Sequence, residues 1–282
     1  MSMNRFKTVI LLAALSGLIL LIGGWIGGQA GLTIALVLAV LMNFFSYFFS
    51  GKMVLAIYRA KPLAKSDAPG IHKIVEDLAK KAGIPKPKIY VIPTEAPNAF
   101  CTGRNPKNSV IAVTHGILKL LNKKELEGVL AHELSHAKNR DILISTIAAT
   151  LAAVIMYVAS MARFAAMFGG MRNNDNGPNI LQILILAIIA PLAAMVIQLA
   201  ISRSREFLAD ETSAKLTKEP QHLASALLKL EEYSKRIPLK FGNQATAHLF
   251  IVNPLTGRQM ANFFSTHPST KDRVERLNAM KS

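Results

Sequence analysis

Two histidines and a glutamate near the middle of the chain carry the strongest chemical signal in the sequence. His132, Glu133 and His136 form the pattern H-E-x-x-H. On a helix, side chains four residues apart lie one above the other on the same face, so both imidazoles can face one metal ion. Glu133 then lies beside them, where it can take a proton from a metal-bound water. In a helical context the pattern predicts a zinc hydrolase.

The residues around the motif predict that this context is helical. Residues 123–130 lead into it with apolar side chains at helical spacing, and no proline follows until Pro178. Asn122 is a candidate N-cap with Glu125 three residues later, which is close to a capping box. The alternative is a chance H-E-x-x-H on a surface helix, and the features described below argue against it.

The composition indicates a membrane protein. Of the 282 residues, 51% are hydrophobic, and the mean hydropathy of +0.32 is high for a soluble domain of this length. The net charge of +16 suits either nucleic acid or the cytoplasmic side of an anionic membrane, and the apolar segments favour the membrane. Cys101 is the only cysteine, so an internal disulfide is impossible and a reducing compartment is expected.

Four long uncharged runs predict four transmembrane helices. They cover approximately residues 9–26, 31–50, 142–162 and 180–202. A helix needs about 20 residues to cross the hydrocarbon core, and the short links predict that the runs form two hairpins. We interpret the first run as a retained span because it is long for a signal peptide, lacks a clear A-x-A site and is followed at once by another span.

Basic residues predict the orientation of the first hairpin. They lie outside its spans and are absent from the link between them: Arg5, Lys7, Lys52, Arg59 and Lys61. By the positive-inside rule, both ends of the hairpin face the cytoplasm. We therefore expect a multi-pass protein of the cell (inner) membrane with its catalytic domain in the cytoplasm. The expected divisions are a hairpin at 1–50, a first catalytic part at 51–141, a hairpin at 142–202 and a second catalytic part at 203–282.

The soluble parts predict a mixture of helices and strands. In the first part we expect a helix at 68–81, strands at 88–92 and 108–114, an extended segment at 97–103 and a helical stretch from 115. In the second part we expect helices starting near 204, at 223–233 and at 272–281. The expected fold class is a mainly α membrane protein: four transmembrane helices plus an α+β zincin-like cytoplasmic catalytic domain with a small mixed sheet.

The predicted hairpins bring a third metal ligand to the two histidines. His136 lies just before the third span and Glu206 just after the fourth, so both return to the same side of the membrane. We predict that Glu206 completes the metal site, because two histidines, a glutamate and water form a known hydrolytic arrangement. Asp210 shares a helix face with Glu206 and is expected to accept the other ring N–H of His132. Asp210 and Glu211 are the alternative third ligands, and an interfacial salt bridge to Arg203 or Arg205 is the alternative role for Glu206.

These motifs resemble those of a known family. The chain is similar to membrane-anchored HtpX-type zinc proteases, relatives of the CAAX prenyl proteases, which carry H-E-x-x-H and a downstream E-x-x-x-D. Both are present here, the second as Glu206 to Asp210. Further points of resemblance are Asn98-Ala99-Phe100 ahead of the zinc helix and His267-Pro268 near the C-terminus. The hydropathy pattern and motif order match over nearly the whole chain.

The resemblance implies a zinc endopeptidase with one Zn²⁺ per chain that cleaves misfolded or damaged membrane proteins. It makes His267 a candidate donor to the oxyanion that forms on the attacked carbonyl, with an ordinary loop histidine as the alternative. Residues 97–103 are expected to form an exposed edge strand that pairs with an extended substrate. Asn98, Ala99 and Phe100 are then candidate substrate-binding residues, although Asn98 also fits an ordinary turn position.

Three other functions compete with proteolysis. A non-catalytic zinc scaffold predicts the metal without turnover, and the intact Glu133 argues against it. A transporter is disfavoured because the four spans carry no ionisable group at their centres. Nucleic-acid binding through the basic charge lacks a recognition motif, so we expect protein substrates and the lipid bilayer as partners and no nucleic acid. The native substrates and the oligomeric state do not follow from the sequence.

Overall fold

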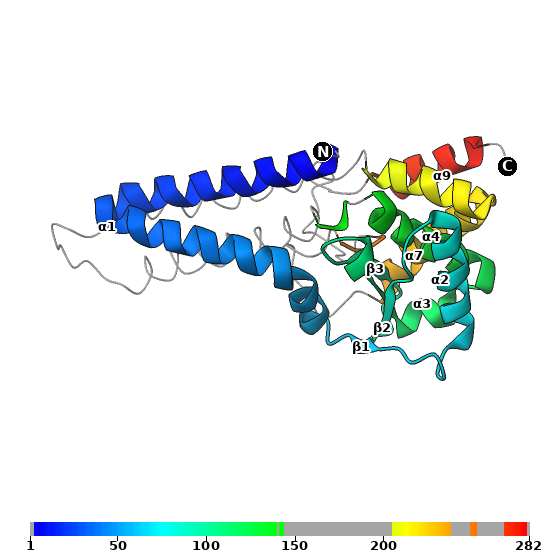
Figure 1. Ribbon diagram of the computed structural model, residues 1–282. Helices are drawn as coiled ribbons and strands as arrows, with labels where there is room; N and C mark the ends of the chain where they lie inside the picture. The colour runs from blue at the N-terminus through cyan, green and yellow to red at the C-terminus, as the bar shows by residue number, and fades with distance from the viewer. Residues whose placement is uncertain (1–2, 140, 144–204, 238–248, 253–267, 281–282) are drawn as a thin grey trace.

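The computed structural model describes residues 3–139, 141–143, 205–237, 249–252 and 268–280. It begins with α1 (Met3–Ile57), a helical hairpin whose chain direction reverses at Gly28, with φ 54° and ψ −137°. Glycine tolerates this backbone conformation because it has no Cβ. The reversal falls within the predicted link at 27–30, and Figure 1 shows the two arms of α1 lying side by side.

The two arms of α1 approach one another through small residues. A Cβ on Gly31 would overlap the carbonyl oxygen of Gly23, and a Cβ on Gly23 would overlap Ala35. Close backbone contact at small residues is typical of packed membrane helices. Within the described chain one segment, Gly27–Phe49, is long and apolar enough to cross a membrane. The expected spans at 142–162 and 180–202 lie outside the described residues apart from positions 142 and 143, so a set of four spans stays a prediction.

A four-stranded mixed sheet follows α1, in the order β1-β2-β4-β3. The strands are β1 (Lys61–Pro62), β2 (Lys88–Ile92), β3 (Ala99–Thr102) and β4 (Val110–Thr114). β2 and β4 are parallel, whereas β1 and β3 pair antiparallel with their neighbours. The predicted small mixed sheet is confirmed. β1 was not predicted, because two residues that include a proline carry no strand pattern.

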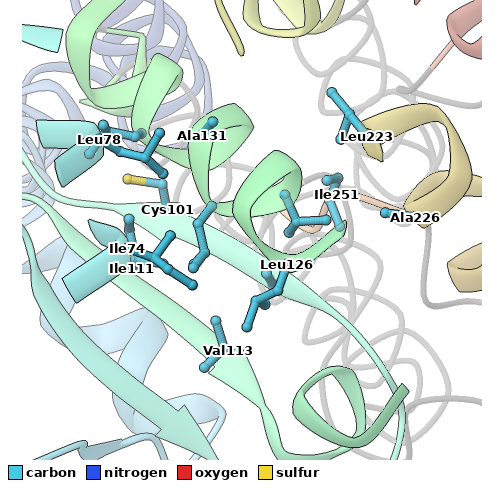
Figure 2. Packing of buried hydrophobic residues seen from close by; sticks show 14 of the residues in the cluster. Ile74, Leu78, Cys101, Ile111, Val113, Leu126, Ala131, Leu223, Ala226 and Ile251 are labelled. Carbon is cyan, nitrogen blue, oxygen red and sulfur yellow. The ribbon is translucent and has the colours of Figure 1, made fainter. Parts of the chain in front are cut away.

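Helices cover one face of the sheet, and the end of α1 covers the other. On the first face, Ile111 and Val113 of β4 pack against α2 (Pro69–Ala82) and α4 (Lys123–Asn139), as Figure 2 shows. On the opposite face, the rings of Tyr58, Phe100 and Phe250 cluster, with centroids 4.9–5.8 Å apart. Successive strand residues alternate between these two cores, as the pleat requires.

The motif helix α4 starts at the predicted capping box. The side chain of Asn122 accepts hydrogen bonds from the backbone N–H groups of Lys124 and Glu125, both at 3.0 Å. In return, Glu125 Oε2 accepts the backbone N–H of Asn122 at 3.0 Å. This exchange satisfies three donors at the start of the helix and fixes where the H-E-x-x-H turn begins.

The remaining helices pack against α4 and against one another. They are a helix at 205–217, α7 (Pro220–Arg236) and α9 (Thr270–Ala279), and the short elements α3 (His115–Leu120) and η1 (Pro106–Asn108) precede α4. α4 and α7 approach closely at Gly128, where a Cβ would lie 3.0 Å from the backbone nitrogen of Leu223. Ser213, on the helix at 205–217, donates a hydrogen bond to the carbonyl of Gly128 at 3.0 Å. These contacts hold the helix at 205–217 beside α4.

Candidate metal centre

Three side chains from two helices bring their donor atoms together. His132 and His136 lie on one face of α4, with their Nε2 atoms 3.2 Å apart. Glu206, on the helix at 205–217, places its carboxylate oxygens 3.5 Å from His132 Nε2 and 3.6 Å from His136 Nε2. One donor atom from each residue lies within 4.8 Å of the other two. The structure therefore groups the three residues that were predicted to hold the metal.

The charges around these atoms suit a divalent cation. The ionic groups that interact here are the buried side chains of Glu133, Asp141, Glu206, Asp210 and Arg273, together with Arg205, which is partly exposed. With neutral imidazoles, the described residues contribute four carboxylates and two guanidinium groups here, which is an excess of two formal negative charges among them. Buried charge requires compensation, and two imidazole nitrogens with one carboxylate oxygen form a donor set used by catalytic zinc. The residues present therefore fit a zinc ion.

His132 is held from the side opposite Glu206. Its Nδ1 lies 2.9 Å from Asp210 Oδ1, and the imidazole is fully buried. An Nδ1–H donated to Asp210 leaves the Nε2 lone pair free for a metal. This is the contact that the E-x-x-x-D spacing predicted, and the orienting role of Asp210 stays a prediction. Asp210 itself is engaged with Nδ1, which disfavours it as the third ligand.

His136 has a carboxylate partner of its own. Its Nδ1 lies 3.2 Å from Oδ2 of Asp141, which lies two residues beyond the end of α4. Burial lowers the pKa of His136, but the carboxylates of Asp141 and Glu206 outweigh this effect and raise the pKa to about 10. A zinc ion binds neutral imidazole, so binding at this site must displace a tightly held proton.

Glu133 lines a cavity beside the metal-ligand atoms. The cavity is bounded by Cys101, Glu133, His136, Ile142, Glu206, Leu249, Phe250 and Ile251. Glu133 is buried, with 1% of its surface exposed, and its Oε2 has no hydrogen-bond partner among the residues that the structure describes. Burial raises the pKa of Glu133, while His132 and His136 oppose the increase. A buried carboxylate oxygen without a partner is the group most able to accept a proton from a reactant.

The other acidic candidate on the same helix points elsewhere. Glu211, considered as an alternative third ligand, is half exposed and forms an ion pair with Lys215 one turn later. Arg205, the alternative partner for Glu206, interacts electrostatically with both Glu206 and Asp141. The geometry therefore favours Glu206 as the ligand and leaves Arg205 as a flanking charge.

The predicted substrate-binding residues are buried against another part of the chain. Asn98 Nδ2 donates to the carbonyl of Val252 at 2.8 Å, the Ala99 carbonyl accepts from Ile251 N at 3.1 Å, and Phe100 forms an antiparallel bridge with Phe250. The expectation of an exposed edge strand is therefore wrong, because residues 249–252 lie along the outer edge of β3. A substrate strand can pair there only by displacing them. The substrate-binding roles stay predictions.

Comparison with known proteins assigns the family. Residues 65–281 match the model of peptidase family M48. The chain belongs to peptidase family M48. It is 56% identical to a protein named Protease HtpX homolog from Syntrophobacter fumaroxidans, over 98% of this chain and 99% of that one. A second Protease HtpX homolog, from Pyrococcus furiosus, is 54% identical over 96% of this chain and 94% of its own.

A solved structure shares the fold of this M48 peptidase. The crystal structure of S. mikatae Ste24p aligns with a TM-score of 0.55 and 19% identity. The alignment covers 97% of this chain and 65% of Ste24p. The predictions of an HtpX-type protein and of a metallopeptidase are confirmed by the family and by these relatives.

Two charged residues beside the candidate metal centre, Asp141 and Arg273, were not predicted from the sequence. Asp141 follows His136 by five positions, and a carboxylate just past the motif helix was a usable signal. Arg205 was considered only as a salt-bridge partner. Arg273 gave no signal, because an arginine on a short basic helix normally faces solvent. His267 lies outside the described residues, so its predicted role stays a prediction.

Proposed function

We propose that this M48 peptidase is a zinc-dependent endopeptidase of the cytoplasmic membrane that cleaves misfolded or damaged membrane proteins. The observation that carries the proposal is the convergence of His132, His136 and Glu206 next to Glu133, whose Oε2 has no hydrogen-bond partner among the described residues. Two relatives that carry the name Protease HtpX homolog support a proteolytic role. Membrane-protein substrates are inferred from the family resemblance.

His132, His136 and Glu206 would hold the zinc ion. Zinc in such a site lowers the pKa of a bound water toward about 7 and thereby supplies a nucleophile at neutral pH. In this proposal Glu133 takes the proton of the attacking water and later delivers it to the leaving amine, and its carboxylate lines the same cavity as His136 and Glu206.

The carbonyl oxygen of the scissile bond becomes negatively charged as the peptide is attacked and requires a donor. His267 is our candidate for that donor, and Asn98 is our candidate for direct contact with substrate. His267→Ala should lower kcat with little change in KM if it serves only the transition state. A higher KM with unchanged kcat, or no change in either parameter, would remove His267 from this role.

The proposed location places both ends of α1 in the cytoplasm. The apolar segment Gly27–Phe49 and the basic residues that follow it support membrane insertion with this orientation. A protease added to inside-out membrane vesicles should digest residues 51–141 and 203–282. Protection of these parts in inside-out vesicles, with digestion in right-side-out spheroplasts, would reverse the orientation.

Zinc-dependent cleavage of an unfolded protein tests the activity itself. The purified full chain in detergent should cleave casein, lose this activity with a chelator and regain it when zinc is added. A non-catalytic scaffold would bind zinc without cleaving casein. Cleavage that persists in the chelator, after removal of the metal is verified, would exclude the proposed chemistry.

A further inference from the structure

Arg273 of α9 is a fully buried arginine that contacts the candidate metal centre. Only 2% of its surface is exposed. Its Nε and Nη2 lie 2.9 and 2.7 Å from the two oxygens of Asp210, which is a bidentate pair. Its Nη1 donates to the carbonyl of Ile251 at 2.9 Å and also lies 3.7 Å from Glu206 Oε2. One side chain thus connects α9, the segment at 249–252 and the helix that carries Glu206.

The oxygen that orients His132 is also one of the two that Arg273 holds. Asp210 Oδ1 lies 2.9 Å from His132 Nδ1 and 2.7 Å from Arg273 Nη2. The guanidinium group has donors and no acceptor, so the Nδ1 proton of His132 can go to Asp210 but not to Arg273. The rigid fork of Arg273 therefore fixes the position and direction of the Asp210 carboxylate.

Burial of this guanidinium group is difficult to explain by stability alone. A buried ion pair is frequently no more stable than apolar residues of similar volume. What the pair provides is a carboxylate with defined direction, placed behind an imidazole. Groups that orient a metal ligand in this way typically change metal affinity by about 10- to 100-fold when they are removed.

We infer that Arg273 is a positioning residue for the zinc site. Its bidentate ion pair with Asp210 sets the ring orientation and tautomer of His132. The inference rests on the proposed zinc function of His132. It also means that α9, although it supplies no metal ligand, determines how tightly the ligands bind. The same guanidinium group also holds the segment at 249–252, through its hydrogen bond to the carbonyl of Ile251.

Arg273→Lys is the first test, since lysine keeps the charge and loses the bidentate fork. The full-length variant should bind zinc about tenfold more weakly in competition with a chelating dye. The absorption spectrum of its cobalt-substituted form should also change. The matched control is Lys271→Gln on the same helix, whose side chain is 82% exposed and which should match the wild type in both measurements.

A double-mutant cycle with Asp210→Asn separates positioning from general destabilisation. If Arg273 acts through Asp210, Arg273→Lys should weaken zinc binding little further in the Asp210→Asn background. Additive losses, or unchanged zinc affinity in Arg273→Lys, would overturn the inference. Thermal unfolding in chelator monitors the metal-free fold. If Arg273→Lys does not fold, the fallback is Arg273→Met in the Asp210→Asn background, which removes both charges. Its zinc affinity should equal that of Asp210→Asn alone, and a clearly weaker affinity would overturn the inference.

The same measurements distinguish this inference from the proposed function. A wild-type protein that binds no zinc, or binds zinc without cleaving casein, contradicts the proposed function itself. A wild-type protein that binds zinc and cleaves casein, beside an Arg273→Lys variant of equal zinc affinity and unchanged cobalt spectrum, contradicts the positioning role alone.

Discussion

Helix α4 carries two buried glutamates, Glu125 near its start and Glu133 in the middle, and their surroundings are opposite. Glu125 is 3% exposed, and its carboxylate accepts hydrogen bonds from Ser225 at 2.7 Å, Lys229 at 2.8 Å and the backbone of Asn122 at 3.0 Å. Glu133 is 1% exposed, and the structure describes no partner for its Oε2. The two residues have the same type, helix and burial, and differ in their partners.

The pKa values of the two carboxyl groups shift in opposite directions for this reason. Burial raises the pKa of Glu125, but Lys229, Ser225 and the Asn122 backbone outweigh it, so the pKa falls below its ordinary value. Burial also raises the pKa of Glu133, and there it prevails. A carboxylate whose hydrogen bonds are complete stabilises the fold, whereas one left incomplete next to metal ligands is available for proton transfer. The two glutamates therefore differ in their hydrogen-bond partners rather than in their burial, and this difference supports the proposal that Glu133 transfers protons.

The largest expected effect comes from Glu133→Gln. The amide cannot accept the proton of the attacking water, so casein cleavage should fall by at least about a thousandfold. Zinc content should stay at one per chain, because Glu133 is not among the grouped ligands. Glu125→Gln makes the same substitution roughly two turns earlier and should retain activity in the folded protein. Comparable activity in the two variants would erase the distinction between the two glutamates.

The next largest effect is expected for Glu206→Gln, which replaces a charged ligand with a neutral amide. Zinc affinity should fall by more than about a hundredfold, since even outer-shell changes reach that range. Glu211→Gln on the same helix is the matched control, because Glu211 pairs with Lys215 and lies away from the site. Zinc retained by Glu206→Gln and lost by Glu211→Gln would move the third ligand to Glu211.

The sequence predicts those features of the site that depend on helical periodicity and capping. The four-residue spacing of His132 and His136 fixes a shared helix face, and the Asn122–Glu125 pair fixes where that helix begins. Glu206 and Asp210 were predicted from the expected hairpin at 142–202, which returns the chain to the same side of the membrane as His136. Each of these inferences needs only local geometry and the direction of the chain.

The sequence could not reveal contacts that depend on how separate elements pack. Arg273 looks like a surface residue until α9 is placed against the helix at 205–217. Likewise, the pattern at 97–103 predicts a strand correctly. Residues 248–254 fit either a strand or a loop, and the sequence does not indicate that residues 249–252 pair with the edge of that strand. Tertiary packing decided both cases.

A smaller effect, on stability rather than on activity, is expected at Glu125. Glu125→Gln removes the charge that pairs with Lys229 while it keeps an acceptor for the Asn122 backbone. The free energy of unfolding at pH 7 should fall by about 1.5–3 kcal/mol, which is the range for a hydrogen bond to a charged group. Denaturant unfolding of the full-length protein in detergent with a chelator measures this, and zinc affinity should not change. A loss of zinc affinity without a loss of stability would assign Glu125 to the metal centre.

The smallest expected effect is the pH dependence of that stability difference. The folded-state pKa of Glu125 lies below its ordinary value of 4.5, so the ionised carboxylate stabilises the fold above about pH 4.5 and this stabilisation disappears as the pH falls through the folded-state pKa. The difference in unfolding free energy between wild type and Glu125→Gln should therefore be constant from pH 7 to about pH 5 and shrink at lower pH. Subtracting the variant from the wild type at each pH, with chelator in both samples, cancels the titration of groups that the two proteins share. A difference that grows on acidification would mean that Glu125 has a raised pKa like Glu133, and burial alone would then govern both carboxyl groups.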